Sequence, residues 1–185
     1  MEETKILPGT WKASLRLLLN PRESDSNTTP RIAILGVGNL LRSDDAAGIL
    51  AARGLLQREF AAKADHVLIL EAGQAPENRT GEIRKFAPNL VLIMDAADMG
   101  EAPGTVRWIS ETDIDGMSAS THSLPLSMLA HYLRLELKCD VRILGIQVGS
   151  NDVGEKINPD VLRAVDEIVD ELNRSIEGLS RSSLS

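Results

Sequence analysis

Short apolar runs alternate with longer amphipathic stretches along most of this chain. Runs in which nearly every residue is apolar are typical of strands buried on both faces, and helices between such strands indicate a mostly parallel sheet. The expected fold is therefore an α/β three-layer sandwich, in which a twisted, mostly parallel central sheet carries helices on both faces. The predicted strands span residues 32–37, 67–70, 90–94, 106–109 and 141–146, and the predicted helices span 46–60, 125–137 and 159–176.

The first thirty residues differ from the remainder of the chain. Residues 11–19 carry apolar side chains at the spacing of one helix face. Residues 21–30 are polar, rich in Ser and Thr and bounded by prolines, as in a linker. The helix is expected to pack on the edge of the domain, the alternative being an arm that binds a partner. The resulting domain organisation is an N-terminal helix and polar linker at 1–30, an α/β domain at 31–177 and a flexible tail at 178–185.

Composition narrows the function classes. The 185 residues include 20 Lys and Arg against 27 Asp and Glu, a net charge of −7, which argues against a nucleic-acid partner. The single cysteine, Cys139, excludes an internal disulfide and an all-cysteine metal site, and it fits a reducing compartment. No apolar run is long enough to span a bilayer, and the N-terminus has no signal-peptide pattern. The expected localisation is cytoplasmic, without membrane insertion.

Polar residues next to the predicted strands and helices are the first candidates for chemistry, because ligands bind beyond the carboxyl ends of parallel strands. Asp44 and Asp45 follow the first strand, Asp95 ends the third, and His122 precedes the helix at 125–137. Two carboxylates and an imidazole can hold a divalent ion and leave coordination positions open. Asp95 ends an apolar run, where a carboxylate must be paired, hydrogen-bonded or metal-bound. Asp44 and Asp45 are equally compatible with capping the next helix, and His122 with a structural role.

Several other motifs have simpler explanations. Gly36-Val37-Gly38 matches the start of the Gly-x-Gly-x-x-Gly pattern of dinucleotide-binding proteins. The pattern requires a third glycine at position 41, where this chain has Leu41, so the two glycines indicate a backbone turn. His66 and His131 are expected to be structural or surface residues. Cys139 has no His or Cys at ligand spacing and is not expected to act as a nucleophile. The sequence contains neither a Gly-x-Ser-x-Gly elbow nor an HExxH helix.

Five motifs in a fixed order resemble the hydrogenase maturation endopeptidases, particularly the hydrogenase 3 type. The resemblance covers residues 31–175. The motifs are Gly36-Val37-Gly38-Asn39 with Ser43-Asp44-Asp45, Ala75-Pro76-Glu77-Asn78, Asp95-Ala96-Ala97-Asp98-Met99-Gly100, Thr121-His122-Ser123-Leu124-Pro125-Leu126 and Leu144-Gly145-Ile146-Gln147.

The resemblance implies a hydrolase that removes the C-terminal extension of a nickel–iron hydrogenase large-subunit precursor after nickel insertion. It implies that Asp45, Asp95 and His122 recognise nickel carried by the substrate, with another divalent ion such as zinc as the alternative. Asp45 and Asp95 are the catalytic candidates, in either a metal-dependent or an aspartic-type peptidase. The alternative function is a non-catalytic nickel-checkpoint or metallochaperone module that binds the large subunit. The oligomeric state stays open.

The chain departs from the family pattern in three places. The family often has Gly where this chain has Ala46, and Pro where it has Val148. The arm at residues 1–30 is also longer than the usual pattern. None of these departures removes a predicted metal ligand.

Overall fold

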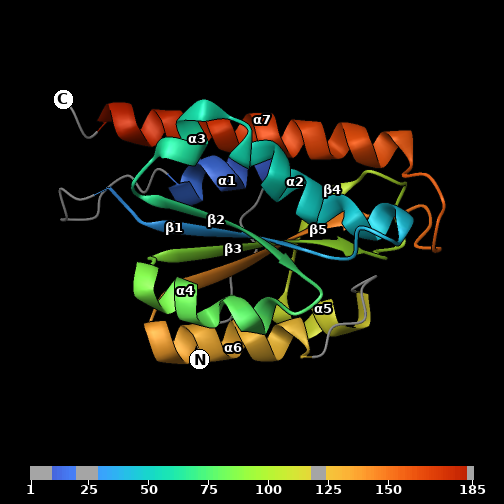
Figure 1. Ribbon diagram of the computed structural model, residues 1–185, viewed down its shortest axis with the longest axis horizontal. Coiled ribbons are helices and arrows are strands. Elements are labelled where there is room, and N and C mark those ends of the chain that lie inside the picture. Colours follow the sequence, from blue (N-terminus) through green and yellow to red (C-terminus); the bar gives the residue numbers. More distant parts are fainter. Residues whose placement is uncertain (1–9, 20–28, 118–123, 183–185) are drawn as a thin grey trace.

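The computed structural model describes residues 10–19, 29–117 and 124–182 and has a five-stranded sheet between two layers of helices (Figure 1). The strand order is β2-β1-β3-β5-β4; neighbouring strands are parallel except β4, which runs antiparallel to β5 at the edge. This arrangement confirms the α/β three-layer prediction.

The strands are β1 (Ile32–Val37), β2 (Val67–Gly73), β3 (Leu90–Ala97), β4 (Val106–Ile109) and β5 (Asp140–Gln147). The helices are α1 (Trp11–Leu19), α2 (Ala47–Leu56), α3 (Glu59–Lys63), α4 (Thr80–Phe86), α5 (Glu111–Met117), α6 (Leu126–Leu137) and α7 (Pro159–Ser182), with 3-10 turns η1 (Ser43–Ala46) and η2 (Pro76–Arg79).

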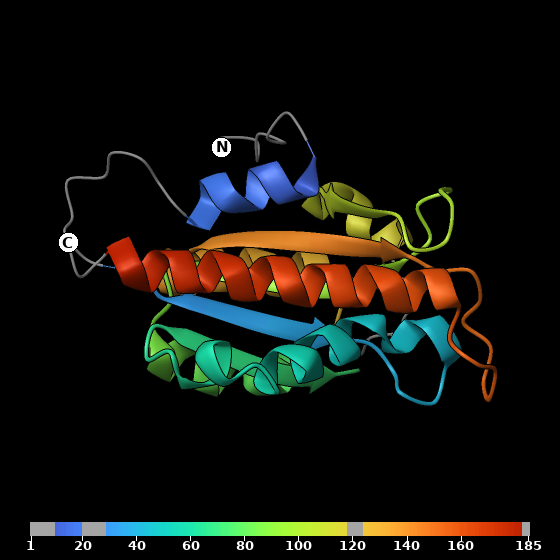
Figure 2. The same cartoon turned by 90° about the horizontal axis from the view of Figure 1, so that it is seen from above.

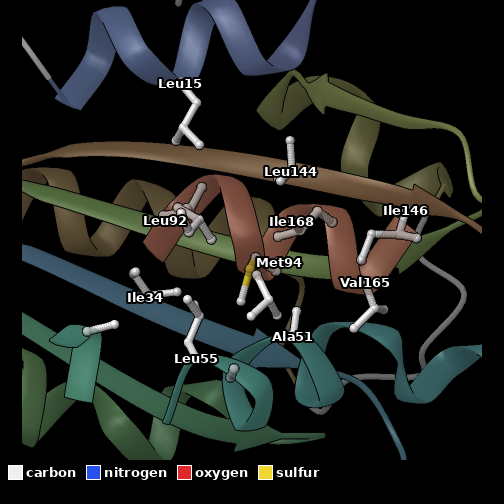
Figure 3. Packing of buried hydrophobic residues seen from close by; sticks show 14 of the residues in the cluster. Leu15, Ile34, Ala51, Leu55, Leu92, Met94, Leu144, Ile146, Val165 and Ile168 are labelled. Carbon is white, nitrogen blue, oxygen red and sulfur yellow. The ribbon is translucent and has the colours of Figure 1, made fainter. Parts of the chain in front are cut away.

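The sheet is buried on both faces, which explains why its strands are apolar throughout. Helices α1, α2, α3 and α7 cover one face, and α4, α5 and α6 cover the other (Figure 1). Leu92 and Met94 of β3 belong to the core on the α2 and α7 side, whereas Val91 and Ile93 belong to the core on the α5 and α6 side. Figure 3 shows the first of these cores. Side chains therefore alternate between two cores along each central strand, as the pleat requires.

Helix α1 is part of the domain's packing. Figure 1 shows it on the same side of the sheet as α7. Leu15 and Leu19 are buried in the core, with at most 1% of their surface exposed. Arg16 donates two hydrogen bonds to Glu171 of α7, with Nε–Oε1 and Nη2–Oε2 distances of 2.5 and 3.0 Å. The predicted helix and its packing on the domain are confirmed, and residues 21–28 of the predicted linker lie outside the described residues.

Some predicted boundaries are wrong. The single helix expected at 46–60 is divided into η1, α2 and α3, because Arg58 adopts an extended backbone (φ −83°, ψ 112°) between α2 and α3. Strand β3 continues three residues past 94 and carries Asp95 inside the sheet, since β5 pairs with it as far as Ala97. Helix α7 ends at Ser182, beyond the predicted helix end at 176, so residues 178–182 of the predicted flexible tail are helical. Helices α4 and α5 were not predicted.

None of the helices in the described ranges has both the length and the apolar character needed to cross a bilayer.

Candidate functional site

Asp45 and Asp95 lie at the same edge of the sheet. Strands β1 and β3 are parallel neighbours with Gly36 opposite Met94, so Asp95 lies near the end of β1. Asp45 belongs to η1, the turn that follows β1. Both side chains are buried: the residues expose 1% and 0% of their surface, respectively. Two carboxylates are thus taken out of water at the carboxyl edge, where ligand sites of parallel sheets lie.

Glycines let the turn that carries Asp45 pack tightly on the strand ends. Gly38 has a φ of +134°, and a Cβ there would overlap the main-chain oxygen of Asp45 and lie 3.8 Å from its Oδ1. The same Asp45 oxygen accepts a hydrogen bond from Asn39 N at 3.1 Å. At Gly48, near the start of α2, a Cβ would overlap the main-chain oxygens of Met94 and Val37. Helix α2 therefore begins directly on β1 and β3 and fixes Asp45 against the strand that carries Asp95.

Arg107 lies in the same lateral row of the sheet as Asp95. Asp95 is opposite Gly145 of β5, and Gly145 is opposite Arg107 of β4. Residues opposite each other in a sheet point to the same face, here the face covered by α5 and α6. Arg107 Nη2 lies 3.7 Å from Met117 Sδ at the end of α5. The row thus contains a guanidinium two strands away from Asp95, which the sequence patterns did not reveal because the register of β4 depends on tertiary pairing.

Gln147 holds the loop that follows β3. Its Oε1 accepts hydrogen bonds from Met99 N at 2.6 Å and Glu101 N at 3.2 Å. Its Nε2 donates to Asp98 Oδ1 at 3.2 Å and to the Val148 main-chain oxygen at 2.8 Å. The side chain is therefore a cross-link between the ends of β3 and β5. Its place in the Leu-Gly-Ile-Gln motif marked the residue, but the motif did not reveal this role.

Asp44 has a structural role that differs from the predicted helix cap. Its Oδ2 accepts hydrogen bonds from Gly149 N and Ser150 N at 2.7 and 3.0 Å, and its Oδ1 accepts one from Asn158 N at 2.7 Å. The residue is fully buried. Asp44 thus ties the connection between β5 and α7 to the turn that carries Asp45. Neither Asp44 nor Asp45 is an N-cap with a side-chain hydrogen bond: the residues in the cap positions of η1 and α2 are Arg42 and Ala46.

An ion pair occupies the end of β2 next to this edge. Arg53 of α2 donates to Glu71 through Nη2–Oε2 at 2.7 Å and Nε–Oε1 at 3.3 Å. This hydrogen-bonded guanidinium lowers the pKa of Glu71 from its ordinary value. Glu71 is therefore an ionised partner of Arg53, unsuited to the role of a proton acceptor at neutral pH.

The cysteine and two of the histidines lie away from the two aspartates. Cys139 immediately precedes β5 and His66 immediately precedes β2, so both are at the amino edge of the sheet, opposite the two aspartates. Burial raises the pKa of the Cys139 thiol, which disfavours the thiolate that nucleophilic attack requires. Burial also lowers the pKa of His66. His131 is exposed on α6.

His122, the third predicted ligand, lies outside the described residues. The last residue before that segment is Met117, whose main-chain oxygen accepts a hydrogen bond from Asp98 N at 2.6 Å. The end of α5 is thus attached to the loop that begins three residues after Asp95. Within the described ranges, no three His, Cys, Asp or Glu side chains form a group able to hold a metal ion. The shared site of Asp45, Asp95 and His122 stays a prediction.

Comparison with known proteins identifies the family. The family model for HycI hydrogenase maturation protease matches residues 52–175, a range that contains Asp95 and His122 and begins just after Asp45. The hydrogenase 3 maturation protease of Escherichia coli K12 is 39% identical over 115 residues, which cover 62% of this chain and 70% of that protein.

Solved structures agree with this match. The crystal structure of a NiFe hydrogenase maturation protease HycI from Thermococcus kodakarensis KOD1 has a TM-score of 0.72 and 32% identity, covering 80% of this chain and 93% of that one. The solution structure of the endopeptidase HycI from Escherichia coli has a TM-score of 0.67 and 33% identity, covering 78% and 90%. The fold and these matches agree: the chain belongs to the hydrogenase maturation protease family and is a peptidase.

Proposed function

We propose that this peptidase removes the C-terminal extension of a nickel–iron hydrogenase large-subunit precursor after nickel has been inserted. In this proposal, Asp45, Asp95 and His122 recognise nickel that the substrate carries. Nickel is then part of the substrate, and zinc or another divalent ion is the alternative occupant.

The observation that carries the proposal is the burial of Asp45 and Asp95 at one edge, next to the ends of adjacent strands. Burying ionised carboxylates is unfavourable unless hydrogen bonds or a cation compensate for the lost hydration. Carboxylate oxygens and a histidine nitrogen are ligands that divalent first-row metals accept. A precursor that presents nickel at this edge gains ligand bonds to these side chains, whereas a nickel-free precursor does not. Selection of the loaded precursor follows from this difference in binding.

The same residues supply the proton transfer that hydrolysis needs. One aspartate accepts a proton from a water molecule as the water oxygen bonds to the scissile carbonyl carbon. The carbon–nitrogen bond then breaks, and the protonated aspartate returns that proton to the leaving nitrogen. Cys139 lies at the opposite edge and Glu71 is held by Arg53, so neither competes for this role.

The test is cleavage of a purified precursor. The protein is incubated with nickel-loaded and nickel-free large-subunit precursor, and mass spectrometry measures release of the C-terminal peptide. We expect release from the loaded form only, loss of release with Asp95→Asn, and normal release with Asp166→Asn, an exposed control on α7. Equal cleavage of both precursor forms would refute nickel recognition, and no cleavage of either would refute the proposed reaction.

A further inference from the structure

Two turns beside Asp45 expose large apolar side chains to solvent. Leu41 and Val153 each expose 74% of their surface, and Leu40 exposes 47%. Leu40 and Leu41 lie between β1 and η1, and Val153 lies between β5 and α7. We refer to these three residues as the apolar rim. Figure 2 shows both connections at the end of the molecule toward which β1 and β5 point.

Hydrogen bonds hold the two turns together. Gly154 N donates to the Leu41 main-chain oxygen at 3.2 Å, next to Val153. Arg42 Nε donates to the Asn151 main-chain oxygen at 3.1 Å, and Ser43 Oγ donates to that of Lys156 at 3.0 Å. The side chains of the rim are therefore presented by a backbone that is already fixed, which lowers the entropy lost on binding.

The rim is also fixed relative to the catalytic candidate. Asp44, directly before Asp45, binds the main-chain nitrogens of Gly149, Ser150 and Asn158, which flank the Val153 turn. Asp45 N in turn donates to the Arg42 main-chain oxygen at 2.8 Å, one residue after Leu41. The two turns are therefore attached directly to the backbone of Asp44 and Asp45.

We infer that the apolar rim docks against an apolar surface of the folded large-subunit precursor, next to the extension that is cut. This inference rests on the proposed function and adds the surface by which the precursor's body is held. Burying an exposed apolar side chain against a partner contributes favourable free energy to binding, because it removes apolar surface from water. Because the rim adjoins Asp45, docking there brings the extension to the two aspartates.

Other exposed apolar residues provide matched controls. Leu135 of α6 exposes 67% of its surface and Leu17 of α1 exposes 55%, and neither lies on the turns beside Asp45. Leu135→Asp and Leu17→Asp therefore make the same chemical change on other elements. Thermal unfolding of every variant checks that each one folds.

The experiment measures binding and cleavage separately. Biolayer interferometry at low temperature gives the Kd for nickel-loaded precursor, and mass spectrometry verifies that the precursor stays intact during binding. We expect Leu41→Asp and Val153→Asp each to raise Kd about tenfold, corresponding to burial of one apolar side chain. The double variant should raise Kd and KM about a hundredfold and leave kcat within about twofold, while both controls stay within about twofold of the unsubstituted protein.

The outcomes distinguish this inference from the proposed function. The docking inference is overturned if the double variant binds the precursor as tightly as the unsubstituted protein does. It is also overturned if the unsubstituted protein does not bind the precursor. If ultracentrifugation shows that the rim substitutions break a dimer and leave precursor binding unchanged, the rim belongs to a second copy and the inference is again overturned. If binding follows the rim but no peptide is released, docking stands and the proposed reaction fails.

Discussion

Replacing Asp44 by Asn should destabilise the fold, because its carboxylate accepts three main-chain hydrogen bonds while fully buried. An amide retains one acceptor oxygen. If that oxygen faces the main-chain nitrogens of Gly149 and Ser150, the amide nitrogen faces Asn158 N. The charge-assisted hydrogen bond from Asn158 N is then lost, and two N–H donors face each other. A hydrogen bond to a charged group contributes about 1.5–3 kcal/mol, and leaving its partner unsatisfied adds a penalty of similar size. We expect Asp44→Asn to lower the free energy of unfolding by about 3 kcal/mol.

Thermal unfolding followed by circular dichroism measures this effect. For a chain of this size, 3 kcal/mol corresponds to a fall in Tm of about 6–12 °C. The matched control is Asp152→Asn, an exposed aspartate on the connection that Asp44 holds, which should change stability by about 0.5 kcal/mol at most. Asp45→Asn should reduce cleavage but keep a Tm above that of Asp44→Asn. A Tm for Asp44→Asn within about 2 °C of the unsubstituted protein would refute the assigned structural role.

Three further predictions concern the proposed ligands and the attachment of α1. His122→Ala should abolish peptide release from nickel-loaded precursor with Tm unchanged; normal release by the folded variant would remove His122 from the site. Asp95→Asn should reduce cleavage more than Asp45→Asn, because Asp95 lies inside the sheet and Asp45 in a turn; side-by-side kinetics giving the reverse order would make Asp45 the better general base. The Arg16 hydrogen bond lowers the pKa of Glu171 from 4.5, so this pair stabilises the fold above pH 4.5 and the effect is lost as pH falls through the lowered pKa. Urea unfolding from pH 6 to 3 should therefore show a weaker pH dependence for Glu171→Gln, and parallel curves would contradict this.

The sequence predicted the parallel sheet and the edge that carries Asp45 and Asp95, because continuous apolar runs and the residues that follow them are local signals. It did not predict where β3 ends. The apolar run stops at Met94, but β5 supplies backbone partners as far as Ala97, so pairing extends the strand past a charged residue. Similarly, the break between α2 and α3 occurs at Arg58, whose guanidinium binds Asp170 of α7, far away in the sequence.

The sequence predicted where Asp44 and Asp45 lie better than it predicted their different roles. Asp44 and Asp45 look alike in the sequence, and both suggested a helix cap. The partners of Asp44 lie 105 to 114 residues away, so only the folded chain reveals that its carboxylate holds a connection. Helix α4 escaped prediction because it is seven residues long and Ile83 is its sole buried residue, which leaves too little periodicity to recognise.

The contact at Gly48 has a consequence for protein engineering. Replacing glycine by alanine in a helix commonly stabilises a protein by about 1 kcal/mol, so helical glycines are routine targets in thermostabilisation. At Gly48 the added methyl group would strike the carbonyl oxygens of Val37 and Met94 and push α2 away from both strands. At Gly178 in α7, nothing lies within 4 Å of the added carbon, and the usual gain should apply. A library that treats the two glycines alike would therefore combine a stabilising substitution with one that separates the turn of Asp45 from the strand of Asp95.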